Sequence, residues 1–290
     1  MSQILSTYRA IQFIEKNLHT EIAVADMADA AAFSLYHFCR VFSQVAHHSP
    51  YDYLMRRRLS EAARELVETG KKIINIGLDY QFNNPETFSR AFKRMFGMQP
   101  SQWKKQSCLD SRCLLPAFSL AYLEHINQGD YLKPVFAQRP SMQLAGVVSL
   151  VEENEPGTIA KLWNVLKEEL VRNEALSPEN YCGVIWYPSV GDRSGFFYMA
   201  AIEIAGVKTQ TPDMMSSDLV TKTIPASTFA RFVHKGPWAK RQLTLDYIYQ
   251  TWLPKSGQHL SNPLEIEYYG QDFQQTVVAE SETKVYIPLA

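Results

Sequence analysis

The chain has 290 residues, of which 46% are hydrophobic, and its formal net charge is −1. This length and composition predict two domains that each bury a core. The four cysteines are scattered and lack CxxC spacing, which excludes a disulfide framework and the usual pattern of a zinc site. We expect a cytoplasmic protein with no membrane partner, because the sequence shows no long apolar run and no signal-like start.

The charge is divided unevenly along the chain. Residues 1–106 contain 14 Lys and Arg against 10 Asp and Glu, a net charge of +4, whereas residues 107–290 contain 15 against 20, a net charge of −5. A basic first part is typical of a nucleic-acid module, and the mildly acidic second part indicates a different kind of partner.

The first predicted helix-turn-helix unit lies within residues 3–44. An amphipathic helix over residues 3–18 precedes a short apolar helix at 24–31, and Ser34 is the predicted N-cap of a third helix that runs to about residue 44. Phe38 and Phe42 face inward on this helix, so the opposite face can reach base edges. The residues predicted to contact DNA from this unit are Ser34, Leu35, Tyr36, Cys39 and Arg40.

A long linking helix is predicted over residues 50–69. At about 1.5 Å per residue it spans roughly 27–30 Å. A rigid spacer of this reach can hold two recognition helices about one duplex turn apart, roughly 34 Å, so that one monomer reads two successive major grooves. Of the three consecutive arginines on this helix, we expect Arg56 and Arg57 to be solvated or near phosphate and Arg58 to form a structural ion pair.

The second helix-turn-helix unit repeats the spacing of the first about fifty residues later. A short helix at 73–79 precedes a helix with Asn84 as its cap, Pro85 in the first turn and Gly97 as its stop. Phenylalanines recur every four residues on the buried face, at Phe88, Phe92 and Phe96. The basic opposite face is typical of a major-groove reader, although an ordinary amphipathic helix with a solvated face is the alternative. The residues predicted to contact DNA here are Asn84, Pro85, Glu86, Ser89, Arg90 and Lys93.

Residues 1–106 resemble the DNA-binding domain of the AraC/XylS transcription regulators. The matching positions include Phe33-Ser34, Phe38, Arg40, Phe42, Ser49-Pro50, Arg58-Leu59, Phe82, residues 88–93, Phe96-Gly97 and Pro100. The resemblance implies an all-α domain with two helix-turn-helix units that binds double-stranded DNA. We also expect a bacterial, nucleoid-associated regulator with RNA polymerase as a further partner, while the sequence leaves open whether it is an activator or a repressor.

Three turn positions depart from this family. Ala32, His47 and Gln81 stand where such domains commonly have glycine, which supplies a positive φ at little cost. We therefore expect slightly strained turns around intact helices. His47 and the adjacent His48 are expected to lie in a solvated turn rather than to bind metal, because they do not share a helical face.

After a predicted linker at 107–129, the pattern changes to alternating strands and helices. One block has a strand at 144–150, a helix at 158–172 and strands at 182–187 and 196–204. The next has strands at 220–224 and 228–234, a helix at 238–252 and strands at 264–269 and 285–287. Two similar strand-helix-strand-strand blocks predict a pseudo-duplicated α+β domain over residues 130–290, with a groove between the copies.

This second domain resembles the GyrI-like small-molecule-binding fold. The resemblance rests on residues 229–237, residues 252–257, Glu267-Tyr268-Tyr269-Gly270 and Tyr286-Ile287-Pro288. It implies a small-molecule effector, and it makes Glu267 the first choice for a ligand-binding acid because this residue occupies the family's Glu-x-Tyr position. An AraC-type domain followed by this fold is the arrangement of Rob-like regulators.

The residue types of the second domain indicate a ligand that is amphipathic and cationic. Glu265 and Glu267 lie at i and i+2, on one face of a strand, and a carboxylate among aromatic rings attracts a flat organic cation. The aromatic residues predicted to line the site are Trp163, Trp186, Tyr187, Tyr198, Trp238 and Tyr269.

Three alternatives to this ligand site stay open at this point. The glutamates could be solvated while the aromatic residues form the core. The domain could be a hydrolase with Glu267 as general base, or a module that docks a protein partner. We expect no enzyme, no cofactor and no metal, because the sequence has no GxSxG, HExxH or P-loop motif.

Overall fold

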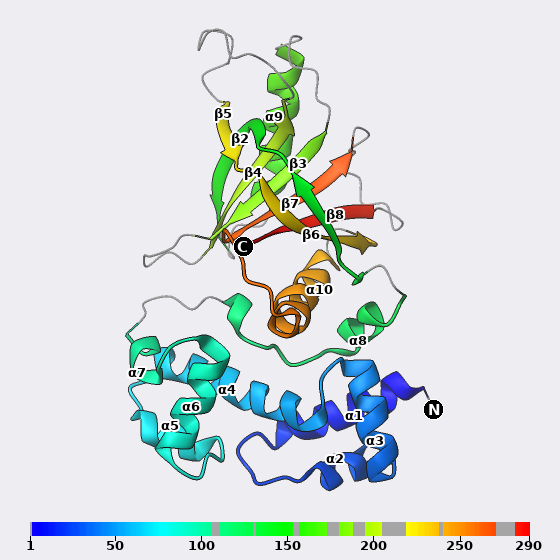
Figure 1. The fold of residues 1–290 in the computed structure, drawn as a ribbon, viewed down its shortest axis with the longest axis vertical. Helices are drawn as coiled ribbons and strands as arrows, with labels where there is room; N and C mark the ends of the chain where they lie inside the picture. The colour runs from blue at the N-terminus through cyan, green and yellow to red at the C-terminus, as the bar shows by residue number, and fades with distance from the viewer. Residues whose placement is uncertain are drawn as a thin grey trace. The chain divides into compact units, whose positions relative to one another are not determined.

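The computed structural model describes residues 2–105, 111–129, 132–152, 157–172, 180–187, 195–204, 219–237, 240–270 and 282–290. Its residues divide into two compact units, each assembled from two parts of the chain. The first unit comprises Met1–Gly129 and Gln242–Ser256, and the second comprises Asp130–Arg241 and Gly257–Ala290. The first unit is helical and the second is built on one sheet (Figure 1).

The helices of the first unit confirm two consecutive helix-turn-helix units. The first consists of α2 (Val24–Ala30) and α3 (Leu35–Ala46), and the second of α5 (Ile73–Asp79) and α6 (Pro85–Phe96). The remaining helices are α1 (Gln3–Lys16), α4 (Pro50–Glu68), α7 (Pro100–Trp103), the 3₁₀ turn η1 (Ser111–Cys113) and α8 (Leu120–Ile126). A further helical stretch consists of α10 (Arg241–Asp246), the π-helix η5 (Tyr247–Trp252) and α11 (Leu253–Ser256). All of it except Arg241 belongs to the first unit.

The phenylalanine rows hold α3 and α6 on their neighbouring helices. Phe38 and Phe42 of α3 and Phe88 and Phe92 of α6 are buried, as the four-residue spacing predicts. Each contributes about 1.5–3 kcal/mol relative to an exposed ring. The rings also pack edge to face or tilted, with centroids 5.4 Å apart in α3 and 5.5 Å apart in α6. The outward faces of both helices are therefore held in fixed orientations.

The arginines of α4 differ from their predicted roles. Arg57 is buried, and its guanidinium donates to Glu15 at 2.8 Å and to the Leu115 carbonyl at 2.6 Å. The prediction that Arg57 is solvated is therefore wrong. Arg58 is structural as predicted, but it donates to the main-chain carbonyls of Leu18 and Thr20 and not to a carboxylate.

The three non-glycine turn residues have the left-handed backbone that the family resemblance led us to expect. The φ angles are 57° at Ala32, 57° at His47 and 65° at Gln81. Side chains other than glycine pay roughly 1–2 kcal/mol in this region because Cβ crowds the following carbonyl oxygen. Each turn therefore stores a small amount of strain.

Replacing Ala32 with glycine is expected to raise the free energy of unfolding of the first unit by about 0.5–1 kcal/mol. Relief of the left-handed strain exceeds the entropy that glycine adds to the unfolded chain. Urea denaturation of the full chain measures the change. Ala25→Gly is the matched control, because Ala25 is an exposed residue within α2, where glycine costs about 0.5–1 kcal/mol. Loss of stability in both variants would refute strain at Ala32.

The first compact unit also includes two segments that lie outside residues 1–106. The described part of the predicted linker contains α8, where the Ser119 side chain caps the helix by accepting from the Tyr122 backbone N–H at 3.1 Å. Leu115, Phe118 and Tyr122 are buried within the first unit. Residues Gln242–Ser256, predicted within the second domain, also group with the first unit.

The second unit contains one antiparallel sheet of eight strands in the order β1-β6-β8-β7-β3-β4-β2-β5. The strands are β1 (Val135–Arg139), β2 (Met142–Val151), β3 (Tyr181–Trp186), β4 (Phe196–Glu203), β5 (Val220–Ile224), β6 (Ser227–Lys235), β7 (Leu264–Gly270) and β8 (Glu282–Leu289). The order is symmetric about the β7–β3 pair, which confirms the predicted duplication. The sequence analysis missed β1, which pairs with β6 at one edge while β5 pairs with β2 at the other.

The two faces of the sheet carry separate apolar clusters. One contains Trp163 of α9 (Thr158–Arg172) with Ile185 and Tyr198, and α9 lies along this face (Figure 1). The opposite cluster contains Val184 and Ile266. Within the described ranges, no helix combines the length and the apolar character needed to cross a bilayer.

Candidate functional site

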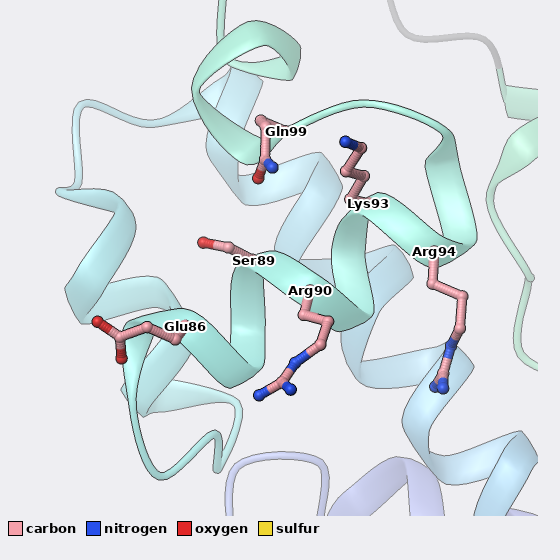
Figure 2. A pocket seen from close by; sticks show the side chains of 6 residues that line it. All are labelled: Glu86, Ser89, Arg90, Lys93, Arg94 and Gln99. Atoms are coloured by element: carbon pink, nitrogen blue, oxygen red, sulfur yellow. The ribbon is translucent and has the colours of Figure 1, made fainter.

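The outward face of α6 forms a basic surface hollow. The Asn84 side chain caps the helix by accepting from the Thr87 backbone N–H at 2.8 Å, and Gly97 ends it with a φ of 75°. The hollow has a volume of about 540 Å³ and is lined by Glu86, Ser89, Arg90, Lys93, Arg94 and Gln99. Figure 2 shows these side chains projecting outward from α6 and from the turn that follows it. Three cations and one acid on one face make it electropositive.

The outward face of α3 is also exposed. Tyr36 is 84% exposed, and Leu35 and Arg40 are exposed beside it. Ser34 stands at the N-cap position as predicted, but its side chain makes no capping hydrogen bond. Arg40 lies one turn beyond Tyr36 on the same face, and its Nη2 is 3.5 Å from His37 Nδ1. An exposed aromatic residue and an exposed arginine one turn apart suit contact with base edges.

The structure therefore leaves most predicted DNA-contacting residues accessible. Two of the predicted residues are half-buried, Cys39 on α3 and Ser89 on α6. Asn84, Pro85, Glu86, Arg90 and Lys93 are exposed. Arg94, absent from the predicted set, lies four residues after Arg90 and also lines the hollow.

Both glutamates of β7 are buried on the same sheet face, as the i, i+2 spacing predicts. Glu265 and Glu267 are each 0% exposed. The alternative that these glutamates are solvated is therefore wrong. Burying a carboxylate requires hydrogen-bond donors or an opposite charge, because desolvation strongly disfavours the ionised form.

Glu267 has both kinds of partner. Arg241 Nη1 donates to Glu267 Oε1 at 2.6 Å, and the Tyr269 hydroxyl donates to Oε2. The chain of hydrogen bonds continues from Tyr269 to the Tyr198 hydroxyl at 3.2 Å, which accepts from Trp163 Nε1 at 3.1 Å. Four of the residues predicted from the sequence are thus linked in one network that ends on Arg241.

Gly183 makes room for this network. It lies opposite Glu267 in the β3–β7 pair. A Cβ atom at this position would lie 2.4 Å from the Tyr198 hydroxyl oxygen and 3.2 Å from Glu267 Oε2. Any larger residue would therefore displace the Tyr198 hydroxyl from its hydrogen bonds with Tyr269 and Trp163.

Arg241 and the two tyrosines of the network have pKa values that lie above their ordinary values. Burial opposes the charge of Arg241, but the Glu267 carboxylate, followed by Tyr269 and Glu265, raises the pKa of Arg241 above its ordinary value. Burial and the charge of Glu267 raise the pKa of both Tyr198 and Tyr269. The guanidinium stays charged, and both phenols stay protonated as donors.

The remaining predicted ligand residues do not join this network. Trp186 lies with the opposite cluster, stacked on Phe197 at 5.6 Å with the Lys222 ammonium 4.3 Å from its ring centroid. Tyr187 packs against Phe196 at 5.9 Å, on the edge of the cluster that contains Trp163. Trp238 lies outside the described residues.

Sequence reasoning missed Arg241 and Gly183. Arg241 gave no distinct signal, because a single arginine in a predicted helix is ordinarily a surface residue. A glycine within an apolar strand does indicate close approach by another group, and that signal could have identified Gly183.

Comparison with known proteins identifies two domains in the chain. A family described as a helix-turn-helix domain matches residues 27–106, and one described as a GyrI-like small molecule binding domain matches residues 132–290. The transcriptional regulator YbfP of Bacillus subtilis is 38% identical over 96 residues, which are 33% of this chain and 32% of YbfP. The transcriptional activator AarP of Providencia stuartii is 35% identical over 92 residues, 32% of this chain and 68% of AarP.

A solved structure, the C-terminal domain of EcmrR, matches with a TM-score of 0.43 and 20% identity, over 55% of this chain and 97% of that domain. The alignment with YbfP spans about a third of that protein, and it lies in the helix-turn-helix part of this chain.

Proposed function

This chain belongs to the AraC-type helix-turn-helix transcriptional regulators that carry a GyrI-like small-molecule-binding domain, and we propose that it reads two successive major grooves of duplex DNA and responds to an organic cation bound at Glu267. One observation carries the DNA-binding part. Two short helices with an exposed arginine each, Arg40 on α3 and Arg90 on α6, belong to helix-turn-helix units that are joined by one long helix, α4.

The dimensions of α4 support the reading of two grooves. Its 19 residues span about 28 Å at 1.5 Å per residue, close to the roughly 34 Å between successive major grooves. Arg40 and Arg90 would each face a guanine edge, with which a guanidinium forms two hydrogen bonds. Lys93 and Arg94, at the sides of α6, suit phosphate contacts that set the register.

The test replaces one arginine on each recognition helix. Arg40→Ala and Arg90→Ala are each expected to weaken specific DNA binding by about 1–3 kcal/mol and to relax base preference at positions about ten base pairs apart. A site selected from random duplexes supplies the DNA, and fluorescence anisotropy measures the affinity.

Arg9→Ala is the matched control, because Arg9 is an exposed arginine on α1 of the same unit. Its loss should leave base preference unchanged. Base preference that stays unchanged in both the Arg40 and Arg90 variants would reject the assignment of α3 and α6 as readers.

The charge and aromatic character of the second site support a cationic ligand. Among the described residues, the Glu265 and Glu267 carboxyl groups lie on one face of β7, and the Arg241 guanidinium pairs with Glu267. Trp163 and Tyr269 meet edge to face at 5.5 Å beside Glu267. Aromatic rings stabilise a flat or quaternary cation through their quadrupoles, and the acid supplies the opposite charge. The binding experiment is given with the role of Arg241 below.

A further inference from the structure

Glu267, the acid proposed to bind an organic cation, already forms an ion pair with a cationic side chain of its own chain, Arg241. The Arg241 side chain is almost fully buried, and its Nη1 lies 2.6 Å from Glu267 Oε1. A guanidinium is a planar, delocalised and weakly hydrated cation, so it has the chemical features expected of the ligand. An incoming cation therefore has to compete with Arg241 for the same carboxylate.

Arg241 is also the first residue of α10 and the last residue of its part of the second unit. From Gln242 to Ser256, the chain groups with the first unit instead. One peptide bond thus separates the residue paired with Glu267 from a segment packed among the DNA-binding helices. A displacement of the Arg241 backbone therefore also displaces Gln242, the first residue of that segment.

Residues 242–256 are held in the first unit by buried hydrogen bonds. The Thr251 hydroxyl lies 3.2 Å from His48 Nε2 and 3.1 Å from the Tyr122 hydroxyl. The Thr244 hydroxyl lies 2.8 Å from His125 Nε2. These three bonds fix the segment at two turns of its length.

Two further contacts of this segment lie at the C-terminal end of α3. Lys255 Nζ donates to the carbonyl of His47, the residue that ends α3, and the Tyr247 ring meets the His47 ring edge to face at 5.7 Å. His48 follows directly and also bonds Asp52 of α4 through Nδ1 at 2.8 Å. The segment therefore touches the turn that sets α3 relative to α4.

The segment includes an uncommon helical form. Tyr247–Trp252 is a π-helix between two α-helical turns. π-helical turns are rare and occur frequently at functional sites. Because a π turn and an α turn differ by one residue in their hydrogen-bond spacing, this stretch can absorb a displacement at its N-terminal end by changing register.

We propose that Arg241 is an internal competitor for the cation site, and that a bound cation releases Arg241 from Glu267 and thereby alters the hold of residues 242–256 on the end of α3. The proposal rests on the ligand function proposed above. It predicts that the resting protein has reduced cation affinity, because the binding-competent form is only the fraction in which Glu267 is free of Arg241.

The first experiment measures the binding of tetraphenylphosphonium to the full chain by titration calorimetry. Arg241→Gln is expected to bind at least about tenfold more tightly than the unmodified chain, and Arg241→Lys should fall in between because it keeps the charge but loses the planar fork. Glu267→Gln should lose binding. Arg139→Gln is the matched control, since Arg139 pairs with Glu203 on the other face of the sheet, and it should bind like the unmodified chain.

The outcomes separate the two proposals. Equal or weaker binding by Arg241→Gln, with binding still lost in Glu267→Gln, overturns the competitor role and leaves the ligand site standing. Binding that does not depend on Glu267, or no binding in any variant, overturns the ligand site and the competitor role together. Should Arg241→Gln fail to fold, an Arg241→Lys affinity equal to that of the unmodified chain counts against the proposal.

The second experiment measures DNA affinity by fluorescence anisotropy. Tetraphenylphosphonium is expected to shift the DNA affinity of the unmodified chain, and Arg241→Gln without the cation should already show the shifted value. Added cation should then change it no further. An Arg241→Gln protein that binds DNA like the cation-free unmodified chain, and still responds to the cation, contradicts coupling through Arg241.

Discussion

Replacing Arg241 with methionine is expected to lower the free energy of unfolding of the second unit by about 3–5 kcal/mol, because Glu267 then remains as a buried carboxylate without its guanidinium. The double variant Arg241→Met/Glu267→Gln should recover most of that loss. Glutamine removes the charge but keeps an oxygen that accepts from the Tyr269 hydroxyl. Urea denaturation measures each variant, with tryptophan fluorescence reporting on the second unit through the buried Trp163.

A second charged pair of the same unit gives the control for this cycle. Arg139 and Glu203 are 3.4 Å apart and their side chains are 24% and 15% exposed. Their coupling in the corresponding cycle, Arg139→Met with Glu203→Gln, should stay below about 1 kcal/mol. Similar couplings for the two pairs would show that burial does not set the strength of the Arg241–Glu267 pair.

Arg57→Leu is expected to destabilise the first unit by about 3 kcal/mol. The change removes the donor to the Leu115 carbonyl and leaves Glu15 and Glu61 without their shared cation. Both carboxylates keep some contact with water. We therefore expect a loss of unfolding free energy at the lower end of the range for breaking a buried ion pair. Urea denaturation followed through the buried Trp103 measures it.

The neighbouring arginine provides a matched comparison. Arg56 pairs with Asp52 at 3.0 Å, but its side chain is 23% exposed against 5% for Arg57. Arg56→Leu should therefore cost less than about 1 kcal/mol. Equal losses for the two substitutions would rule out a structural role specific to Arg57.

The contrast between these two arginines shows where sequence reasoning ends. Periodicity located α4 and its apolar stripe, because a helix has a fixed repeat. The side of α4 that becomes buried also depends on α1 and on the segment around Leu115, which are distant in sequence. The hydrophobic stripe alone does not show that the Arg57 side chain is also buried on that side of α4.

The proposed ligand site also shows which features the local sequence predicts and which depend on strand pairing. The spacing of Glu265 and Glu267 was sufficient to place them on one face, since side chains alternate along a strand. Assigning Trp186 to that face required the register between strands. Trp186 pairs with Leu264, whose side chain belongs to the opposite cluster, and no local pattern specifies that pairing.

The division of the first unit between two parts of the chain has a consequence for its synthesis. Gly129 and Gln242 are the ends of the gap, so the contacts of Thr244 and Thr251 with α8 and with the turn after α3 form only once the later segment has been translated. At roughly 5–20 residues per second, the ribosome reaches Ser256 about 6–25 s after Gly129. During that interval the nascent chain presents both recognition helices without the segment that contacts the end of α3. The first unit is therefore complete only when nearly all of the chain has been made.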